Sequence, residues 1–309
     1  LEQLIRGHLD NDYLVFLAFS LILGAAQGLL GLPLNFYSGF YLEHRFELSN
    51  QTLRQWAWEG VKGILVGIPL MVPMLLALFY CLRAFGADWW LPVGIVLFCF
   101  SVVLARIAPV LIFPLFYKFT PLPESDLKQR ILSLCDKVGM RVSGVFLFNL
   151  SKNTRKANAA FAGIGRSKRV ILGDTLVESF TEDEVETVFA HELGHYVHNH
   201  IWVGMAAGAV STFAGLYLTA RLYDSMLSAF GFTAIDSVAA LPLLGVLLGV
   251  YSLVTSPLGN MLSRSHERAA DRYAIGLTGK KEAFIDALKK LAKTNLADES
   301  PNSLVEFLF

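Results

Sequence analysis

Long apolar runs, free of Asp, Glu, Lys and Arg, dominate the hydrophobic pattern of this chain. A helix that crosses the hydrocarbon core of a bilayer needs about 20 consecutive apolar residues. The runs that meet or approach this length are Tyr13–Leu42, Gly63–Leu82, Trp89–Ala105 (continuing past Arg106 to Tyr117), Ile201–Ala220 and Ser237–Ser263. The pattern therefore predicts five membrane spans.

The polar stretch 118–200 separates the third run from the fourth and has a different pattern. Apolar residues recur there at helical spacing over Glu124–Val138. Short strand patterns follow at Val142–Leu150, Asn158–Gly163 and Arg169–Leu172. Thr181–Glu184 then has the pattern of a capping box, which predicts a helix from near Glu182 through at least His200.

Composition agrees with insertion into a membrane. Charged residues make up 17% of the chain and hydrophobic residues 54%, and the mean hydropathy is +0.50. Soluble domains carry about 25% charged residues, so this composition argues against a soluble enzyme and excludes a disordered or collagen-like chain. The net charge is zero, so no general basic field attracts nucleic acid, and we expect no nucleic-acid partner.

The distribution of positive charge predicts the orientation. Five spans place the polar segments alternately on two sides, and 43–62, 118–200 and 264–309 share one of them. That side carries 22 of the 26 Lys and Arg residues, and the other side carries three. The positive-inside rule makes the side with 118–200 cytoplasmic.

The predicted helix after Glu182 carries His191-Glu192-Leu193-Gly194-His195, an H-E-x-x-H motif. Residues four apart lie on one helix face, so both imidazoles can bind one Zn²⁺. Glu192 projects from the neighbouring position, where it can take a proton from water. The alternative is a surface helix that carries two histidines and an acid by chance. The capped helix start and the apolar residues of its first turns argue against that alternative.

A catalytic zinc site needs a third protein ligand. A metzincin would supply a histidine at position 201, which is Ile, so that subclass is excluded. Glu267 could complete the set, and Asp271, four residues later on the same helix face, could accept the free ring N–H of a ligand histidine. Two predicted spans separate His195 from Glu267, which returns Glu267 to the same side of the membrane. We expect His198 and His200 to be structural or interfacial rather than ligands, and we do not expect His266, on a different helix face from Glu267, to be a ligand.

These residues resemble the type I CAAX prenyl protease family, which consists of integral-membrane, gluzincin-type zinc metalloproteases. The resemblance covers most of the chain, in the family's order. The matching segments are Tyr41–Phe46, Asn50–Thr52, Pro114–Pro123, Asn158–Gly163, Arg169–Thr175, His191–His200 and Ser263–Asp271.

The resemblance implies a mostly α, polytopic membrane protein, with a ring of transmembrane helices around a water-filled chamber and an inserted α+β zincin-like protease domain. It implies one Zn²⁺ per chain, held by His191, His195 and Glu267. It also implies that Glu192 is the general base and that Asp271 orients a ligand. The physical reading of these residues agrees with each of these roles.

The same resemblance places Asn158 in an edge strand that binds an extended substrate by β-augmentation. An asparagine can both donate to and accept from a peptide, and the small residues up to Ala162 and Gly163 let another backbone approach. The alternative for Asn158 is an ordinary turn residue. Family members usually carry two further spans before the segment that opens this chain and a His-Pro-Pro motif after its end.

The expected organisation follows. A transmembrane region of three spans covers 1–117, and the protease domain with the H-E-x-x-H helix covers 118–200. Two further spans cover 201–263, and the C-terminal part of the protease domain, with the third ligand, covers 264–309.

The predicted function is a membrane-embedded zinc metalloendopeptidase that cleaves C-terminal, CAAX-like tails, with or without a prenyl group, or other membrane-protein substrates. Its partners would be such peptides and membrane lipids, in a bacterial inner membrane or the endoplasmic reticulum. The alternatives are a quality-control protease without prenyl specificity and a non-enzymatic scaffold with a vestigial zinc site. A site-2-type protease would need an Asp-Gly ligand motif, and no Asp-Gly dipeptide occurs in the chain.

Overall fold

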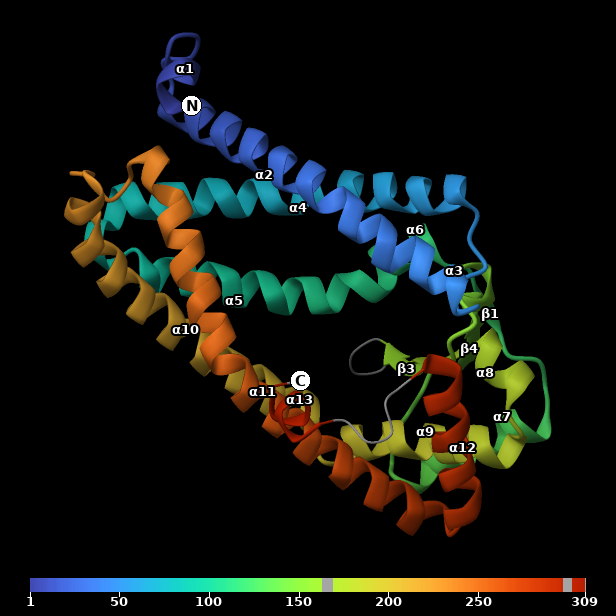
Figure 1. Cartoon of the computed structure of the whole chain (residues 1–309). Coiled ribbons are helices and arrows are strands. Elements are labelled where there is room, and N and C mark those ends of the chain that lie inside the picture. Colours follow the sequence, from blue (N-terminus) through green and yellow to red (C-terminus); the bar gives the residue numbers. More distant parts are fainter. Residues whose placement is uncertain (163–168, 297–301, 309) are drawn as a thin grey trace. The chain divides into compact units, whose positions relative to one another are not determined.

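The computed structural model describes residues 1–162, 169–296 and 302–308 (Figure 1). Its helical segments that are long and apolar enough to cross a membrane are Asp12–Arg45, Leu53–Asp88, Trp90–Phe116, His200–Phe230 and Val238–Thr278. They confirm the predicted spans. Several continue past the apolar runs, because lengthening an existing helix adds one hydrogen bond for each residue that is fixed.

The described chain is mostly helical. The helices are α1 (Glu2–Arg6), α2 (Asp12–Phe36), α3 (Glu43–Arg45), α4 (Leu53–Phe85), α5 (Trp90–Ile107), α6 (Phe113–Phe116), α7 (Asp126–Lys137), α8 (Asp174–Ser179), α9 (Glu182–Val197), α10 (His200–Leu227), α11 (Leu241–Thr278), α12 (Lys281–Asn295) and α13 (Ser303–Leu308). The strands are β1 (Phe119–Pro121), β2 (Val145–Phe148), β3 (Ala159–Ala162) and β4 (Arg169–Gly173). Short π-helical turns lie at Tyr37–Leu42 and Ala108–Ile112.

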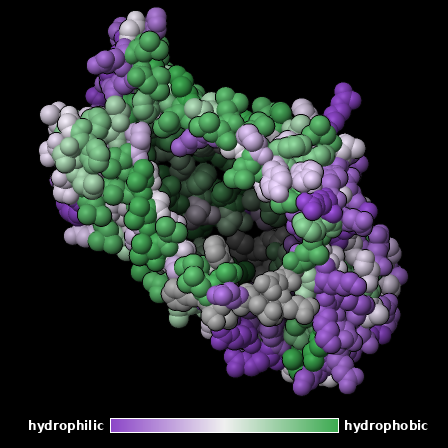
Figure 2. All heavy atoms as spheres, in the orientation of Figure 1, coloured by the Kyte–Doolittle hydropathy of each residue, from purple (hydrophilic) through white to green (hydrophobic). Residues whose placement is uncertain are grey.

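The chain divides into two compact units. The first comprises Leu1–Gly39, Trp58–Val103 and Met205–Pro257. Most apolar side chains of its long helices are exposed, as lipid contact requires. Figure 2 shows hydrophobic residues covering these helices, whereas hydrophilic residues gather over α7 and α12 of the second unit.

The second unit comprises Phe40–Ala57, Leu104–Gly204 and Leu258–Phe309 and contains a four-stranded sheet of order β1-β2-β4-β3. Strands β2 and β4 are parallel, and the other two pairs are antiparallel. Helix α9 packs beside β3, where the rings of Phe161 and Phe189 lie 5.3 Å apart. Together with the candidate spans, this small mixed sheet confirms the expected fold class.

The predicted strands are present with changed bounds: β2 is shorter than predicted, β3 begins at Ala159 directly after Asn158, and β4 extends one residue further, to Gly173. Strand β1 was not predicted, because its residues Phe119–Pro121 form a strand only by pairing with β2. Among the described residues, strand β3 lies at the edge of the sheet and pairs with β4 alone. Ala162 pairs with Arg169 at its end, and Gly163 lies outside the described residues.

Helix α9 begins as predicted and ends earlier than predicted. The Thr181 hydroxyl accepts from the backbone N–H of Glu184, and the Glu184 carboxylate accepts from the N–H of Thr181 at 2.7 Å, which completes the capping box. The prediction that the helix continues through His200 is wrong. Asn199 has φ of 56°, a left-handed conformation that asparagine tolerates, so α9 stops at Val197 and α10 starts at His200.

Helices α9 and α11 approach each other closely at Gly194. A Cβ atom on Gly194 would lie 2.8 Å from the Cα and 3.2 Å from the carbonyl oxygen of Ala270. Backbone atoms cannot rotate away as a flexible side chain can, so a larger residue at this position must move the helices apart. The glycine thus sets the distance between the two helices.

We predict that Gly194→Ala lowers the free energy of unfolding by about 1–3 kcal/mol, the usual cost of overpacking a filled interior. Thermal unfolding of the full chain in detergent would measure this change. Gly276→Ala is the matched control on α11, because a Cβ there meets nothing within 4 Å. Equal losses of stability in the two variants would contradict the assigned role of Gly194.

Candidate metal centre

The two histidines of the H-E-x-x-H motif and Glu267 lie together. His191 and His195 project from one face of α9, and Glu267 comes from α11. Potential ligand atoms of the three residues all lie within 4.8 Å of one another. The two Nε2 atoms are 3.1 Å apart, and the Glu267 carboxylate lies 3.2 Å from Nε2 of His191 and 3.7 Å from Nε2 of His195.

This geometry fits a tetrahedral metal ion. Nitrogen and oxygen ligands lie about 2.0–2.2 Å from Zn²⁺, which places neighbouring ligand atoms about 3.3–3.5 Å from each other. The observed distances between 3.1 and 3.7 Å bracket that range. The Nδ1 atoms of both histidines have other partners, Asp271 and His200, each 2.9 Å away. Both Nε2 atoms can therefore be directed at one cation.

Asp271 lies beside His191. Its Oδ1 is 2.9 Å from Nδ1 of His191, so it can accept the ring N–H and leave Nε2 directed at Glu267. Burial lowers the pKa of His191, but the Asp271 hydrogen bond and the nearby carboxylates outweigh burial and raise it overall. Burial lowers the pKa of His195, which favours the neutral ring that a metal requires.

Glu192 lies beside these groups and lines two cavities with Glu267. Burial raises the pKa of Glu192 to about 7, with a further contribution from the negative charge of Glu267 and an opposing one from His191. A bound divalent cation would oppose this rise, because it favours the carboxylate form. A carboxyl group that titrates near neutrality is suited to accept and return protons.

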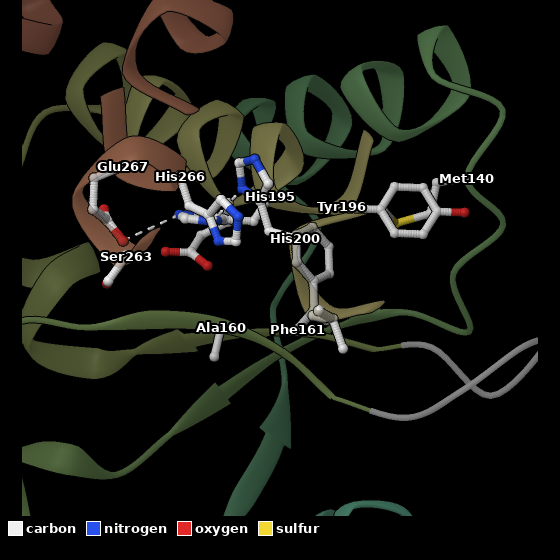
Figure 3. Close-up of a pocket in the computed structure, with 11 residues that line it drawn as sticks. Met140, Ala160, Phe161, His195, Tyr196, His200, Ser263, His266 and Glu267 are labelled. Atoms are coloured by element: carbon white, nitrogen blue, oxygen red, sulfur yellow. Dashed lines mark hydrogen bonds and ion pairs between the residues drawn. The ribbon is translucent and has the colours of Figure 1, made fainter. Parts of the chain in front are cut away.

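The first cavity, of about 440 Å³, is lined by His195 and by two histidines outside the motif, His200 and His266. Figure 3 shows Ala160 and Phe161 of β3 across from His195, His200, His266 and Glu267. The residues that line the second cavity, of about 310 Å³, include Asn158, Ala159, Glu192 and Asp271. The structure thus brings Asn158 to the same cavity as Glu192.

Sequence reasoning missed one contact of the centre. Nδ1 of His200 lies 2.9 Å from Nδ1 of His195, although His200 was expected to be structural or interfacial. His198 does not make this contact, and its ring lies against Tyr273 at 5.6 Å. The signal that could have identified His200 is Asn199, whose tolerance of positive φ permits a helix break between the two histidines.

Comparisons with known proteins give the family. Residues 121–308 match the model of peptidase family M48, and residues 1–118 match the model described as CAAX prenyl protease N-terminal, five membrane helices. The chain is 32% identical to an uncharacterized metalloprotease, YhfN, of Bacillus subtilis, over 99% of this chain and 72% of that protein. It is also 32% identical to CAAX prenyl protease 1 of Saccharomyces cerevisiae, over 95% of this chain and 68% of that protein.

A solved structure agrees with these matches. The crystal structure of S. mikatae Ste24p superposes with a TM-score of 0.84 at 31% sequence identity, over 93% of this chain and 70% of that one. The membrane helices of residues 1–118 and the segment 121–308, which contains the H-E-x-x-H helix, therefore both match CAAX prenyl proteases of family M48. The chain belongs to the CAAX prenyl protease family of M48 peptidases and is an integral membrane metalloprotease.

Proposed function

We propose that this protein is a zinc metalloendopeptidase in which His191, His195 and Glu267 hold one Zn²⁺ and Glu192 is the general base. The observation that carries the proposal is the convergence of the two Nε2 atoms and the Glu267 carboxylate beside Glu192. When bound, zinc acts as a Lewis acid that makes water more acidic and polarises a peptide carbonyl. His and Glu side chains are among the ligands that zinc prefers.

Glu192 would move the proton during hydrolysis. Its carboxylate accepts a proton from the attacking water and then donates that proton to the leaving amine nitrogen. Water supplies the hydroxyl group of the new carboxyl terminus, and its proton completes the new amino terminus. Asp271 would keep the Nδ1 proton of His191 in place, which fixes the orientation of that ring.

The free edge of β3 would hold the substrate backbone. An edge strand presents unpaired N–H and C=O groups, to which an extended peptide can add as a further strand. The Asn158 backbone carbonyl is occupied by the N–H of Gly173 at 2.8 Å, which leaves its amide side chain for substrate. Ala162 lies in β3, which begins directly after Asn158, and we extend the proposal to the neighbouring Gly163 from the sequence alone.

The proposed substrates are C-terminal, CAAX-like tails of proteins at the cytoplasmic surface of the membrane. The second cavity supports an aliphatic side chain next to the cleaved bond, because its remaining walls are largely apolar. They include Leu176, Val188, Phe284, Leu288 and Leu291. The name of the yeast relative supports the substrate class. The excess of positive charge on one side of the membrane supports the orientation.

We predict that Glu192→Gln lowers the rate of peptide cleavage by about 100- to 10,000-fold, the range for loss of a general base. The amide keeps the size of the side chain but cannot accept the proton. Cleavage of a fluorogenic peptide should be compared at equal zinc content, measured by elemental analysis. Equal rates would eliminate this mechanism and favour a scaffold with a vestigial site.

We predict that Asn158→Ala lowers kcat/KM by about 3- to 10-fold, through the loss of one or two hydrogen bonds to substrate. The zinc content and the thermal stability should not change, because the backbone bond to Gly173 remains. An unchanged kcat/KM would indicate that Asn158 is an ordinary residue at the end of a strand.

A peptide series tests the substrate class. Replacing an aliphatic residue that follows the cleaved bond by Asp should lower kcat/KM by about 10- to 100-fold, because an apolar side chain gains roughly 1.5–3 kcal/mol on burial. Equal cleavage of the two peptides would contradict the role of the apolar cavity.

A second pair of peptides, identical except for a prenyl group on cysteine, distinguishes a protease for prenylated tails from a quality-control protease without prenyl specificity. Equal rates for that pair favour quality control of membrane proteins.

A further inference from the structure

We propose that His200 is a positioning residue for the candidate zinc ligand His195: it accepts the Nδ1 proton of His195 and thereby holds Nε2 toward the metal. The inference rests on the proposed zinc site. It concerns a residue outside the H-E-x-x-H motif, on a different helix from His195.

Binding of a metal at Nε2 of His195 would determine the tautomers of both rings. Nδ1 of His195 lies 2.9 Å from Nδ1 of His200, while its Nε2 faces His191 and Glu267. A neutral imidazole carries one N–H, so a ring that offers the Nε2 lone pair to a metal must carry its proton on Nδ1. His200 must then accept at Nδ1 and carry its own proton on Nε2. His200 is not itself a ligand in this arrangement, because the ring of His195 lies between it and the candidate metal position.

The surroundings hold the His200 ring in this orientation. Its ring stacks on that of His266, with centroids 4.0 Å apart and an interplanar angle of 6°. His266 precedes Glu267 on α11, so the helix that supplies the third candidate ligand also supports His200 (Figure 3). The ring of His198 contacts His200 from the preceding turn, with centroids 5.5 Å apart.

The break between the helices makes the contact possible. On a continuous helix, a residue five positions after His195 points about 140° away from it. The left-handed Asn199 ends α9, and its carbonyl accepts from the N–H groups of Trp202 and Val203 at the start of α10. The chain therefore turns directly after the motif, and the first residue of α10 returns to the ring of His195.

The result is a matched pair of supports for the two ligand histidines. Asp271 accepts from Nδ1 of His191, and His200 accepts from Nδ1 of His195. The partners of ligating histidines fix ring orientation, and their loss typically weakens metal affinity by about 10- to 100-fold.

The test measures zinc affinity of the full chain in detergent, by competition with a chromophoric chelator. His200→Phe keeps a flat ring that can stack on His266 but removes the acceptor. His200→Asn places an amide oxygen near the position of Nδ1, whereas His200→Gln places it near that of Nε2. We expect the Phe and Gln variants to bind zinc about 10- to 100-fold more weakly. The Asn variant should stay within about threefold of the wild type.

The absorption spectrum of the Co²⁺-substituted protein gives a readout that does not depend on activity. Its visible bands should shift in the Phe and Gln variants and return toward those of the wild type with Asn. His198→Phe is the matched control, because His198 also contacts His200 but makes no bond to His195. Thermal unfolding of the metal-free protein shows whether His200→Phe folds. If it does not, the comparison of His200→Asn with His200→Gln still tests whether an acceptor at the Nδ1 position is needed.

Three results would overturn the inference. The first is a His200→Gln variant that binds zinc as tightly as the wild type. The second is an equal loss of zinc affinity in the His200→Asn and His200→Gln variants. The third is a loss of zinc affinity in His198→Phe equal to that in His200→Phe. A failure of the zinc site itself appears differently. In that case the wild type binds no stoichiometric zinc, or His191→Ala binds it as tightly as the wild type does.

Discussion

The candidate centre depends on the approach of two helix backbones, α9 and α11, at Gly194 and Ala270. Gly194 lies between the two histidines of the motif, and Ala270 lies between Glu267 and Asp271. A Cβ on Gly194 would lie 2.8 Å from the Cα of Ala270, so only the missing side chain allows this separation. Because Glu and Asp side chains are short, a wider separation would remove both carboxylates from the imidazoles that they now reach.

Hydrogen bonds to the far sides of the rings complete the arrangement. The Nδ1 atoms of His191 and His195 are 2.9 Å from side chains on two other helices, Asp271 on α11 and His200 on α10. In the proposed arrangement each bond selects one tautomer and restricts ring rotation, so that both Nε2 lone pairs are available to a metal. Such preorganisation reduces the conformational entropy that ligand ordering costs.

The sequence by itself predicted the parts of this protein that depend on local pattern. Apolar runs of sufficient length predicted the membrane helices, and Thr181 with Glu184 predicted the start of α9. The four-residue spacing of His191 and His195 placed them on one face, since a helix fixes that relation without reference to the rest of the fold. The number of spans between His195 and Glu267 also predicted that the two reach the same side, because each crossing reverses it.

Only the tertiary structure decided the features that depend on a partner distant in the sequence. Strand β1 forms by pairing with β2, and its own residues carry no strand pattern. The need for glycine at position 194 arises from Ala270, 76 positions away. The contact of His200 with His195 depends on a single left-handed residue, Asn199. Hydrophobic periodicity averages over a whole helix, so it cannot reveal where one residue redirects the chain or where two backbones touch.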